Sequence, residues 1–326
     1  MPTKLLFEDN TYDCNQNESV LDALIGHGVP VPHSCRSGSC QTCLMRATKG
    51  TPPESAQKGL KETLKAQNYF LACSCHPQED MEIALPDADA GRFKATVKTV
   101  ETLSHDIVCL GLHCEQPVDY RAGQFINLFK DSTLGRSYSL ASVPTRDTHL
   151  KLHVRKVPEG RVSGWIHHQL KPGDSVEISQ PIGNCFYVSG NPEQGLLLIG
   201  TGSGLAPLYG IALDAITQGH TGPIRLYHGS RNIEGLYLTE ELRALAKQHP
   251  NFSYTPCISN TEFVAQEGYA TGRALDVALA DINGLSGWRI FLCGNPDMVK
   301  SAKKKAFLSG AAIKDIYADA FTLAAA

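Results

Sequence analysis

Four cysteines constrain this chain more than any other feature of its sequence. Cys35, Cys40 and Cys43 lie in the run CRSGSCQTC with the spacing C-x4-C-x2-C, and Cys73 follows after 29 intervening residues. Plant-type [2Fe–2S] clusters are held by four thiolates with this spacing. Gly38 allows the loop between the first two thiols to fold tightly around such a group. The sequence therefore predicts a loop that wraps a [2Fe–2S] cluster.

Zinc and plain buried thiols are the alternatives to a cluster. Zinc sites usually take their ligands from two separated pairs, whereas three of these cysteines come from one loop. A Rieske centre needs two Cys-and-His pairs, and the sequence offers only Cys73 with His76. We choose Cys73 over Cys75 as the fourth ligand because it directly follows the apolar run YFLA, which leaves Cys75 as a half-buried neighbour.

Length and cysteine usage limit the class of protein. A chain of 326 residues is long enough for two or three domains, each with its own core. The eleven cysteines are an odd number, so a reducing cytoplasm is favoured over a secreted disulfide framework. The sequence shows neither a signal peptide nor an apolar run of the ~18 residues that a membrane span needs, so we expect no membrane attachment.

Charge is divided unevenly along the chain. Residues 1–90 hold 7 Lys and Arg against 12 Asp and Glu, a net charge of −5, whereas residues 91–326 hold 23 against 21, a net charge of +2. An acidic first segment suits transient docking to a basic patch on a redox partner and argues against nucleic acid. A merely solvated acidic surface is the alternative.

The first 88 residues are expected to form a compact β-grasp-like unit. Residues 4–8 and 11–14 are predicted as the two strands of a hairpin, with its turn at Asp9–Asn10. Ser19 is the expected N-cap of a helix with the apolar-periodic body VLDALI. The hairpin, the helix and the cysteine loop together predict this unit.

Two further units are expected beyond a linker at residues 85–92, where Pro, Asp, Ala and Gly gather. Short strands with frequent turns and one helical stretch, VSGWIHHQL, predict an antiparallel β-barrel over 92–190. Strands that alternate with helices predict a doubly wound parallel sheet over 194–326. The expected fold is therefore a multidomain α+β and α/β chain with domains at 1–88, 92–190 and 194–326.

Two motifs in the second unit are suited to bind a nucleotide. Arg136, Tyr138 and Ser139 in GRSYSLAS offer a cation for phosphate, a ring for stacking and a hydroxyl for a ring nitrogen. Gly160 and Ser163 lie at the expected start of a helix, where free backbone N–H groups favour a pyrophosphate. Strands and turns of this kind without a ligand are the alternative.

The third unit begins with a glycine-rich turn. LLLIGTGSGLAPL is a strand that runs into three glycines and then a helix, with Pro207 near its first turn. Such a turn is the usual place for a dinucleotide pyrophosphate, and a tight turn without a ligand is the alternative.

The order of these motifs resembles that of the reductase components of bacterial multicomponent oxygenases, within the ferredoxin–NADP⁺ reductase superfamily. CRSGSCQTC, RSYS, GRVS, GTGSGLAP and CGNPDM follow one another over nearly the whole chain. A cluster domain that precedes the flavin domain is similar to the FAD-containing members. The resemblance implies a ferredoxin domain, an FAD-binding barrel and an NAD(P)-binding domain, with a [2Fe–2S] cluster, FAD and NADH as cofactors and NADPH as the other candidate donor.

The resemblance also implies roles for individual residues. Ser139 would lie close to the reactive flavin nitrogen and Cys293 beside the nicotinamide, as the two catalytic positions; a packed core thiol is the alternative for Cys293. Asp319 and Phe321 match an acid and an aromatic residue that often end the family near the flavin, although Phe321 could instead close the core of the last domain. The implied cofactor-binding residues are Arg136, Ser137, Tyr138, Ser139, His153, Val154, Arg155, Arg161, Val162, Ser163, Thr201, Gly202, Gly204, Pro207, Ser230, Arg231, Cys293, Gly294 and Phe321.

The implied reaction is NAD(P)H-dependent electron transfer to a terminal oxygenase by a monomer that meets its partner transiently. Ser230 and Arg231 follow the second strand of the third unit, where the 2′ group of the nucleotide would lie, and we favour NADH over NADPH. The alternatives are another acceptor (a deoxysugar-forming dehydratase, a haem monooxygenase or a separate ferredoxin), a redox-sensing module without turnover, and a structural zinc protein.

Overall fold

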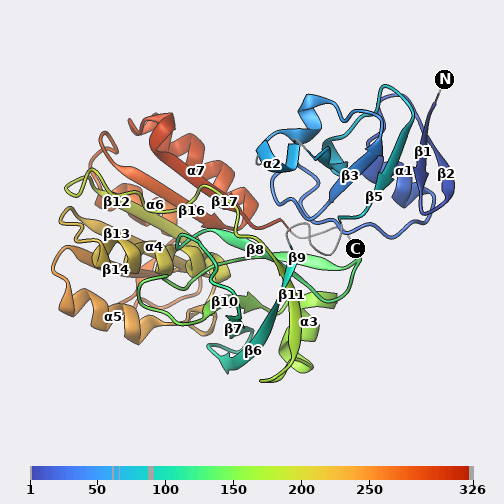
Figure 1. The fold of residues 1–326 in the computed structure, drawn as a ribbon. Helices are drawn as coiled ribbons and strands as arrows, with labels where there is room; N and C mark the ends of the chain where they lie inside the picture. The colour runs from blue at the N-terminus through green and yellow to red at the C-terminus, as the bar shows by residue number, and fades with distance from the viewer. Residues whose placement is uncertain (1, 61, 66, 87–91, 323–326) are drawn as a thin grey trace.

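The chain folds around three separate sheets that follow one another in sequence (Figure 1). The computed structural model describes residues 2–60, 62–65, 67–86 and 92–322. The predicted linker at residues 85–92 lies largely outside the described residues, because 87–91 are among those left out. Each sheet has buried apolar residues that form a core of its own, in agreement with the predicted multidomain fold class.

The first sheet is mixed and has the strand order β2-β1-β5-β3-β4. One helix, α1, packs its four buried residues into the core of this sheet. The elements are β1 (Thr3–Phe7), β2 (Asn10–Cys14), α1 (Val20–Gly26), β3 (Leu44–Lys49), η1 (Glu54–Gln57), α2 (Glu62–Lys65), β4 (Tyr69–Leu71), η2 (Ala72–Ser74) and β5 (Met81–Ala84). The sequence predicted the hairpin and α1 but none of the strands β3, β4 and β5.

Two local predictions for this domain can be compared with the structure. The N-cap prediction is confirmed, since the Ser19 hydroxyl accepts a hydrogen bond from the Asp22 N–H at 3.1 Å. The turn prediction is wrong by one residue. Glu8 and Asp9 take the left-handed backbone conformation, with φ of 49° and 64°, and Asn10 already belongs to β2. Two left-handed residues in a two-residue loop match the twist of a β-hairpin.

The second sheet is antiparallel and six-stranded, with the order β10-β7-β6-β11-β8-β9. A bridge between Leu140 and Leu152 joins the two ends and closes the sheet into a barrel. The elements are β6 (Arg92–Thr102), β7 (Ile107–Cys114), β8 (Phe125–Phe129), β9 (Gly135–Ser139), β10 (Leu150–Arg155), α3 (Arg161–His168) and β11 (Ser175–Ser179). The barrel and its single helix agree with the prediction, although α3 begins at Arg161 rather than Val162.

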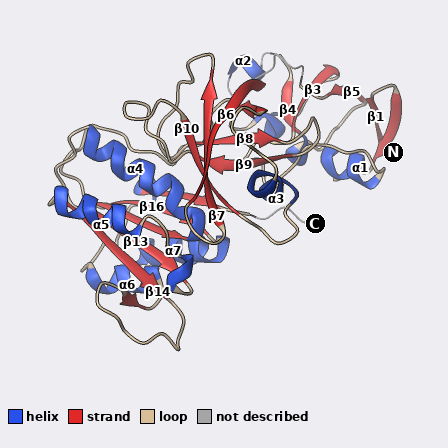
Figure 2. Cartoon of the chain, turned by 90° about the horizontal axis from the view of Figure 1, so that it is seen from below, coloured by secondary structure: helices blue, strands red, loops and turns tan. Residues whose placement is uncertain are grey.

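The third sheet is parallel and doubly wound, with the order β15-β14-β13-β12-β16-β17. Helices α4 and α5 pack on one face, and α6 and α7 pack on the other (Figure 2). The elements are β12 (Leu196–Thr201), η3 (Gly202–Gly204), α4 (Leu205–Thr217), β13 (Ile224–Ser230), η4 (Ile233–Gly235), α5 (Thr239–Gln248), β14 (Phe252–Ile258), β15 (Ala270–Thr271), α6 (Ala274–Asp281), β16 (Arg289–Gly294), α7 (Pro296–Leu308), η5 (Ile313–Asp315) and β17 (Ile316–Ala320).

The two interfaces between neighbouring sheets differ in character. The barrel and the parallel sheet share apolar cores, in which Ile107 and Tyr187 pack with the residues of α4, and Ala122 and Val143 pack with Leu213. The core of the first domain contains, among the described residues, none beyond Leu85. The first domain therefore meets the barrel without a common apolar core.

No helix in the described part of the chain is long and apolar enough to cross a membrane.

Candidate functional site

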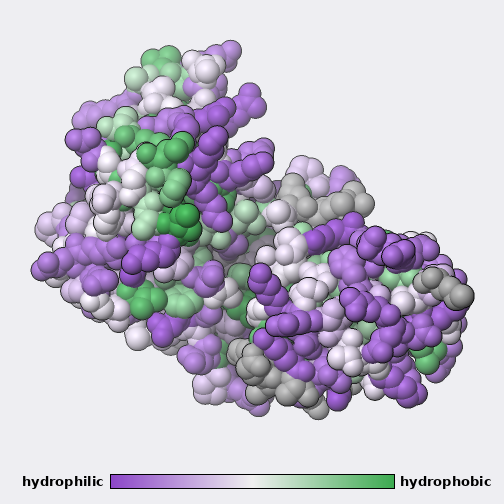
Figure 3. Space-filling view, turned by 90° about the horizontal axis from the view of Figure 1, so that it is seen from above, coloured by the Kyte–Doolittle hydropathy of each residue, from purple (hydrophilic) through white to green (hydrophobic). Residues whose placement is uncertain are grey.

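A cleft of about 1850 Å³ runs between the three sheets and collects most of the predicted site residues. The surface is hollowed between the lobe of the first domain and the lobe of the parallel sheet (Figure 3). Its walls come from the cysteine loop, from strands β9 and β10 with the start of α3, and from the carboxyl ends of β12, β13 and β16. Ligands of open parallel sheets bind at that edge, outside the carboxyl ends of the strands.

The cysteine loop, residues 34–43, forms one end of the cleft. Backbone N–H groups point at its sulfurs: the N–H groups of Ser37 and Cys40 approach the Cys35 sulfur at 3.4 Å each. Gly38 takes φ +73°, a left-handed conformation in which a larger residue is strained, and a Cβ there would lie 2.7 Å from the Ser74 hydroxyl, which would have to move. Inward N–H groups and a tight glycine turn are what a loop around a cluster needs.

The four predicted thiols lie as two pairs. Cys35 exchanges hydrogen bonds with Cys40, and the Cys73 N–H approaches the Cys43 sulfur at 3.5 Å. Within each pair the shared hydrogen bond lowers the pKa of one thiol, Cys35 or Cys73, and raises the pKa of its partner. No group of three His, Cys, Asp or Glu side chains in the described chain is arranged around a single metal ion. Two thiol pairs suit a centre with two irons better than one zinc ion.

Cys75 differs from the expected half-buried neighbour. Residues 72–74 form the 3₁₀ turn η2 rather than an extended strand, so Cys73 and Cys75 do not share a face. Cys73 is partly exposed beside the loop, whereas Cys75 is fully buried in the core, where burial raises the pKa of its thiol to about 12. The geometry therefore brings Cys73, and not Cys75, to the other three thiols.

The barrel supplies the middle of the cleft. Arg136, Ser137, Tyr138 and Ser139 of β9 all line it. The Arg136 guanidinium donates to the His33 carbonyl at 3.1 Å, so this side chain also reaches the first domain. A half-buried arginine and an aromatic ring at a cleft wall fit the phosphate and the flat ring of a flavin nucleotide.

The start of helix α3 lines the cleft with Gly160, Arg161, Val162 and Ser163. Gly160 is the N-cap and offers no side-chain hydrogen bond to the first turn. A Cβ on Gly160 would lie 2.3 Å from the Ser163 hydroxyl, which excludes a larger residue. Uncapped N–H groups and the helix dipole make this end a fit for a diphosphate.

The other walls come from β10 and from the parallel sheet. His153 lines the cleft, and burial lowers the pKa of its imidazole to about 3, so the ring is neutral there. Arg155 lies beside it and forms an ion pair with Asp106 at 2.7 Å. Thr201 ends β12 and Gly202 begins the turn η3, and the Thr201 hydroxyl accepts a hydrogen bond from the Asn295 N–H at 3.1 Å.

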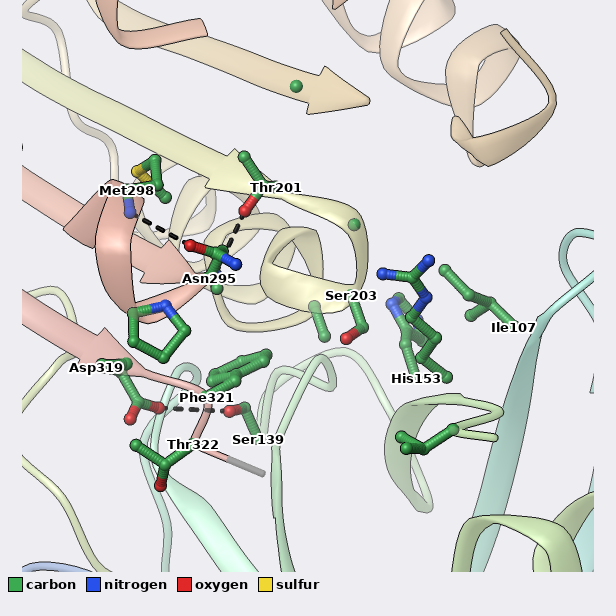
Figure 4. Close-up of a pocket in the computed structure, with 18 of the residues that line it drawn as sticks. Ile107, Ser139, His153, Thr201, Ser203, Asn295, Met298, Asp319, Phe321 and Thr322 are labelled. Carbon is green, nitrogen blue, oxygen red and sulfur yellow. Dashed lines mark hydrogen bonds between the residues drawn. The ribbon is translucent and has the colours of Figure 1, made fainter. Parts of the chain in front are cut away.

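The C-terminal strand brings an acid and an aromatic ring to the same place. The Ser139 hydroxyl donates to the Asp319 carboxylate at 3.3 Å, and Phe321 is drawn beside both (Figure 4). The Phe321 N–H donates to the Gly294 carbonyl at 2.8 Å, which fixes the chain as it leaves β17. Burial raises the pKa of Asp319 to about 6.

Six predicted residues do not line the cleft: the cluster-ligand candidates Cys43 and Cys73, and the four cofactor-binding candidates Val154, Gly204, Pro207 and Cys293. Val154 belongs to the barrel core, and Pro207 is buried in α4. Gly204 is buried because the turn must approach β16, where a Cβ would lie 2.3 Å from the Cys293 carbonyl oxygen. The Cys293 thiol is fully buried, 3.8 Å from the Cys185 sulfur, and burial raises its pKa well above the ordinary value. The expected place of this thiol beside a nicotinamide therefore differs from its observed packing.

Several residues that line the cleft or lie directly behind its wall were missed by the sequence analysis. Arg273 and Lys305 line the end of the cleft near Ser230, and Asn127 of β8 lies behind Ser137. Only Asn127 carried a readable signal, because a single amide in the apolar strand FINLF is a buried polar residue that needs partners.

Three protein-family models match the chain in the same order as its sheets. A 2Fe-2S iron-sulfur cluster binding domain matches residues 7–78, an oxidoreductase FAD-binding domain matches 94–187, and an oxidoreductase NAD-binding domain matches 198–304. The chain is 35% identical, over 93% of both lengths, to a naphthalene 1,2-dioxygenase system ferredoxin–NAD(P)⁺ reductase component of Pseudomonas putida. It is 32% identical to the phenol hydroxylase P5 protein of Acinetobacter pittii, over 97% of this chain and 92% of that one.

The chain belongs to this family of iron–sulfur flavoprotein reductases. A crystal structure of the Amycolatopsis cytochrome P450 reductase GcoB is similar over 99% of this chain and the whole of that one, with a TM-score of 0.71 and 31% identity. The protein is therefore an NAD(P)H-dependent oxidoreductase with FAD and a [2Fe–2S] cluster. The barrel and the first sheet are accordingly the flavin domain and the ferredoxin domain, and the cysteine loop is the cluster loop.

The two candidate fourth ligands can be separated by matched variants. Cys73→Ala is expected to abolish most of the bound iron and acid-labile sulfide, because it removes a thiolate from one of the two pairs. Cys75→Ala is expected to keep the iron and to cost about 1 kcal/mol of stability from a small cavity. Iron and sulfide analysis of both purified variants measures this, and iron loss confined to Cys75→Ala would reverse the assignment.

Asp319 predicts a pH dependence of stability. Its folded pKa of about 6 lies above the ~3.9 of an unfolded aspartate, so its contribution is full below about pH 4 and is lost as the pH rises through about 6. Asp319→Asn is expected to remove a decline of about 2 kcal/mol in the free energy of unfolding between these limits. Denaturant unfolding of both proteins over a pH series measures it, and parallel curves would contradict it.

Proposed function

We propose that this chain takes electrons from NADH and passes them through FAD and the [2Fe–2S] cluster to a terminal oxygenase. One observation carries the proposal: residues suited to the nucleotide, to the flavin and to the cluster line a single cleft. The relatives support the acceptor, since they are named as components of naphthalene dioxygenase and phenol hydroxylase systems. The acidic ferredoxin domain, with its net charge of −5 over residues 1–90, suits a transient complex with a basic surface.

The flavin accepts a hydride from NAD(P)H and the cluster carries single electrons, so the protein supplies binding, orientation and tuning. In this proposal Ser139, whose hydroxyl donates to Asp319, would lie at the reactive edge of the flavin. Tyr138 would stack on the flat ring, and the start of α3 with Arg161 would bind the diphosphate. Thr201 and Gly202 would hold the pyrophosphate of the nicotinamide nucleotide against the parallel sheet.

The thiols of Cys35, Cys40, Cys43 and Cys73 hold the cluster in this proposal, because they form the two pairs beside the cleft. The buried Cys293 acts through packing against the turn at Gly204 rather than by contact with the reacting atoms. The domains are assigned to residues 1–88, 92–190 and 194–326, and the protein is proposed to act as a cytoplasmic monomer.

A second acceptor is favoured by one comparison. The similar crystal structure is that of a cytochrome P450 reductase, which makes a haem monooxygenase the second candidate. Both candidates receive single electrons from the cluster, so the cleft geometry is equally suited to each. Reconstitution with a Rieske-type or diiron oxygenase and with a cytochrome P450 from the same organism would separate them.

The proposal is tested by the absorbance of the purified protein under anaerobic conditions. Flavin and iron–sulfur bands that both bleach on addition of NADH are the expected result. A colourless protein, or bands that neither NADH nor NADPH bleaches, would overturn the electron path. Bleaching of the flavin bands alone would remove the cluster from the path.

The choice of nucleotide depends on the end of the cleft near Ser230. Arg231, Arg273 and Lys305 line it, together with the carboxylate of Asp276, which pairs with Lys305 at 2.6 Å. The cations suit a 2′-phosphate, and the carboxylate suits a 2′-hydroxyl. We propose that NADH is the main donor and that NADPH is also accepted.

Arg231→Ala tests this end of the cleft. The KM for NADPH is expected to rise about 10-fold, because a charge-assisted hydrogen bond to phosphate is lost, while the KM for NADH changes little. Lys303→Ala removes an exposed cation of α7 that does not line the cleft, and it should alter neither value. If Arg231→Ala raised the KM for NADPH and the KM for NADH equally, Arg231 would not be the residue that binds the 2′-phosphate.

A further inference from the structure

Asn127 is a buried amide at the boundary between the ferredoxin domain and the flavin barrel. It is 2% exposed and lies in β8 between Ile126 and Leu128, which point into the barrel core. Because side chains alternate along a strand, Asn127 points away from that core and toward the ferredoxin domain. A buried amide in this place requires hydrogen-bond partners outside the barrel interior.

The Asn127 side chain finds these partners on both sides of the boundary. Its amide nitrogen donates to the Cys40 carbonyl at 3.0 Å, and its oxygen accepts from the Thr42 hydroxyl at 3.1 Å. The same oxygen accepts from the Ser137 hydroxyl of β9 at 2.7 Å. One side chain thus joins the cluster loop to the strand that lines the flavin part of the cleft.

Among the described residues, the two domains share no apolar core at this boundary. The core of the ferredoxin domain includes, in the described part of the chain, no residue of the barrel. A further hydrogen bond across the boundary runs from Arg136 to the His33 carbonyl. Interfaces of this polar kind permit relative motion of domains unless specific contacts hold them.

Asn127 also contacts residues next to those proposed to hold the two electron carriers. Its cross-strand partner is Ser137, and the next pair on the same face of the two strands is Phe125 with Ser139, which both line the cleft. On the other side, the Cys40 sulfur lies 3.1 Å from the Thr42 hydroxyl that donates to Asn127. The amide therefore connects a residue of the flavin wall, Ser137, to the backbone of the proposed cluster ligand Cys40.

We propose that Asn127 is a positioning residue that holds the cluster loop against the flavin wall and thereby sets the rate of electron transfer between flavin and cluster. The proposal rests on the proposed roles of Cys40 and Ser139. In the step concerned, the reduced flavin is oxidised by one electron and the cluster is reduced by one, and NADH supplies the electrons. Asn127 takes no part in hydride transfer, since its partners are the cluster loop and β9.

Asn127→Leu keeps the size of the side chain and removes all three of its hydrogen bonds. We expect NADH to reduce the flavin at the wild-type rate, whereas reduction of the cluster becomes about 10-fold slower because the docked arrangement is less populated. Anaerobic stopped-flow absorbance follows the flavin, and freeze-quench electron paramagnetic resonance follows the cluster. Hydrogen–deuterium exchange of residues 33–43 is expected to rise, which reports positioning independently of turnover.

Matched variants separate positioning from other effects. Ser179→Ala removes the hydroxyl that accepts from the Asn127 backbone N–H at 2.9 Å, a bond within the barrel, and should leave cluster reduction unchanged. Thr42→Val should slow cluster reduction, and Thr42→Ser, which keeps the hydroxyl, should restore it. If Asn127→Leu does not fold, the Thr42 pair carries the test.

The outcomes distinguish this proposal from the proposed function. Wild-type protein that NADH does not reduce would overturn the reductase itself. Wild-type rates of cluster reduction in Asn127→Leu or in Thr42→Val, or slowing that is matched by a changed cluster midpoint potential, would overturn only the positioning role.

Discussion

The side chain of Asn127 joins two domains that do not share an apolar core, and the electron path depends on that junction. The barrel and the parallel sheet are held together by buried apolar side chains from both, such as Ile107 and Leu213. The ferredoxin domain instead meets the barrel through hydrogen bonds from Asn127, Thr42 and Arg136. Hydrogen bonds are directional and apolar contacts are not. The polar boundary therefore fixes the relative orientation of the two domains without joining them into one rigid body.

This difference between the two interfaces suits the two transfers that the protein carries out. Hydride transfer requires a nicotinamide and a flavin in direct contact, which a shared core between barrel and parallel sheet can maintain. Electron transfer to a partner requires the cluster domain to meet a second protein as well as the flavin. A polar boundary that is specific but small allows both encounters.

Each part of the cleft depends on the backbone geometry of a few residues. The cluster loop depends on left-handed residues, including Gly38 and Arg36. The start of α3 is uncapped because Gly160 offers no side chain, and the turn after β12 is close to β16 because Gly204 has no Cβ. Each of these features concerns a few neighbouring residues. Their convergence on one cleft depends on how three sheets pack.

The sequence by itself determined the local elements and the order of the domains. The cysteine spacing, the glycine-rich turn after β12 and the Ser19 cap act over a few residues, and local backbone geometry is what such patterns encode. The periodicity of apolar residues was likewise enough to predict a barrel followed by a doubly wound sheet. Strands β3, β4 and β5 were missed because they pair with partners distant in sequence, and β4 and β5 are also short.

Only the tertiary structure decided which of two similar residues faces the site. Cys73 and Cys75 are two apart, and the η2 turn separates them because α1 packs against it and the Cys75 carbonyl accepts from the Val20 N–H. Cys293 begins the motif CGNPDM, which predicts a place beside the nicotinamide, yet its thiol packs against Cys185 from another domain. The partners of Asn127 in the ferredoxin domain, Thr42 and Cys40, lie 85 and 87 residues away. Direction and partnership of a side chain are set by segments that meet only on folding, and a pattern of neighbouring residues does not contain that information.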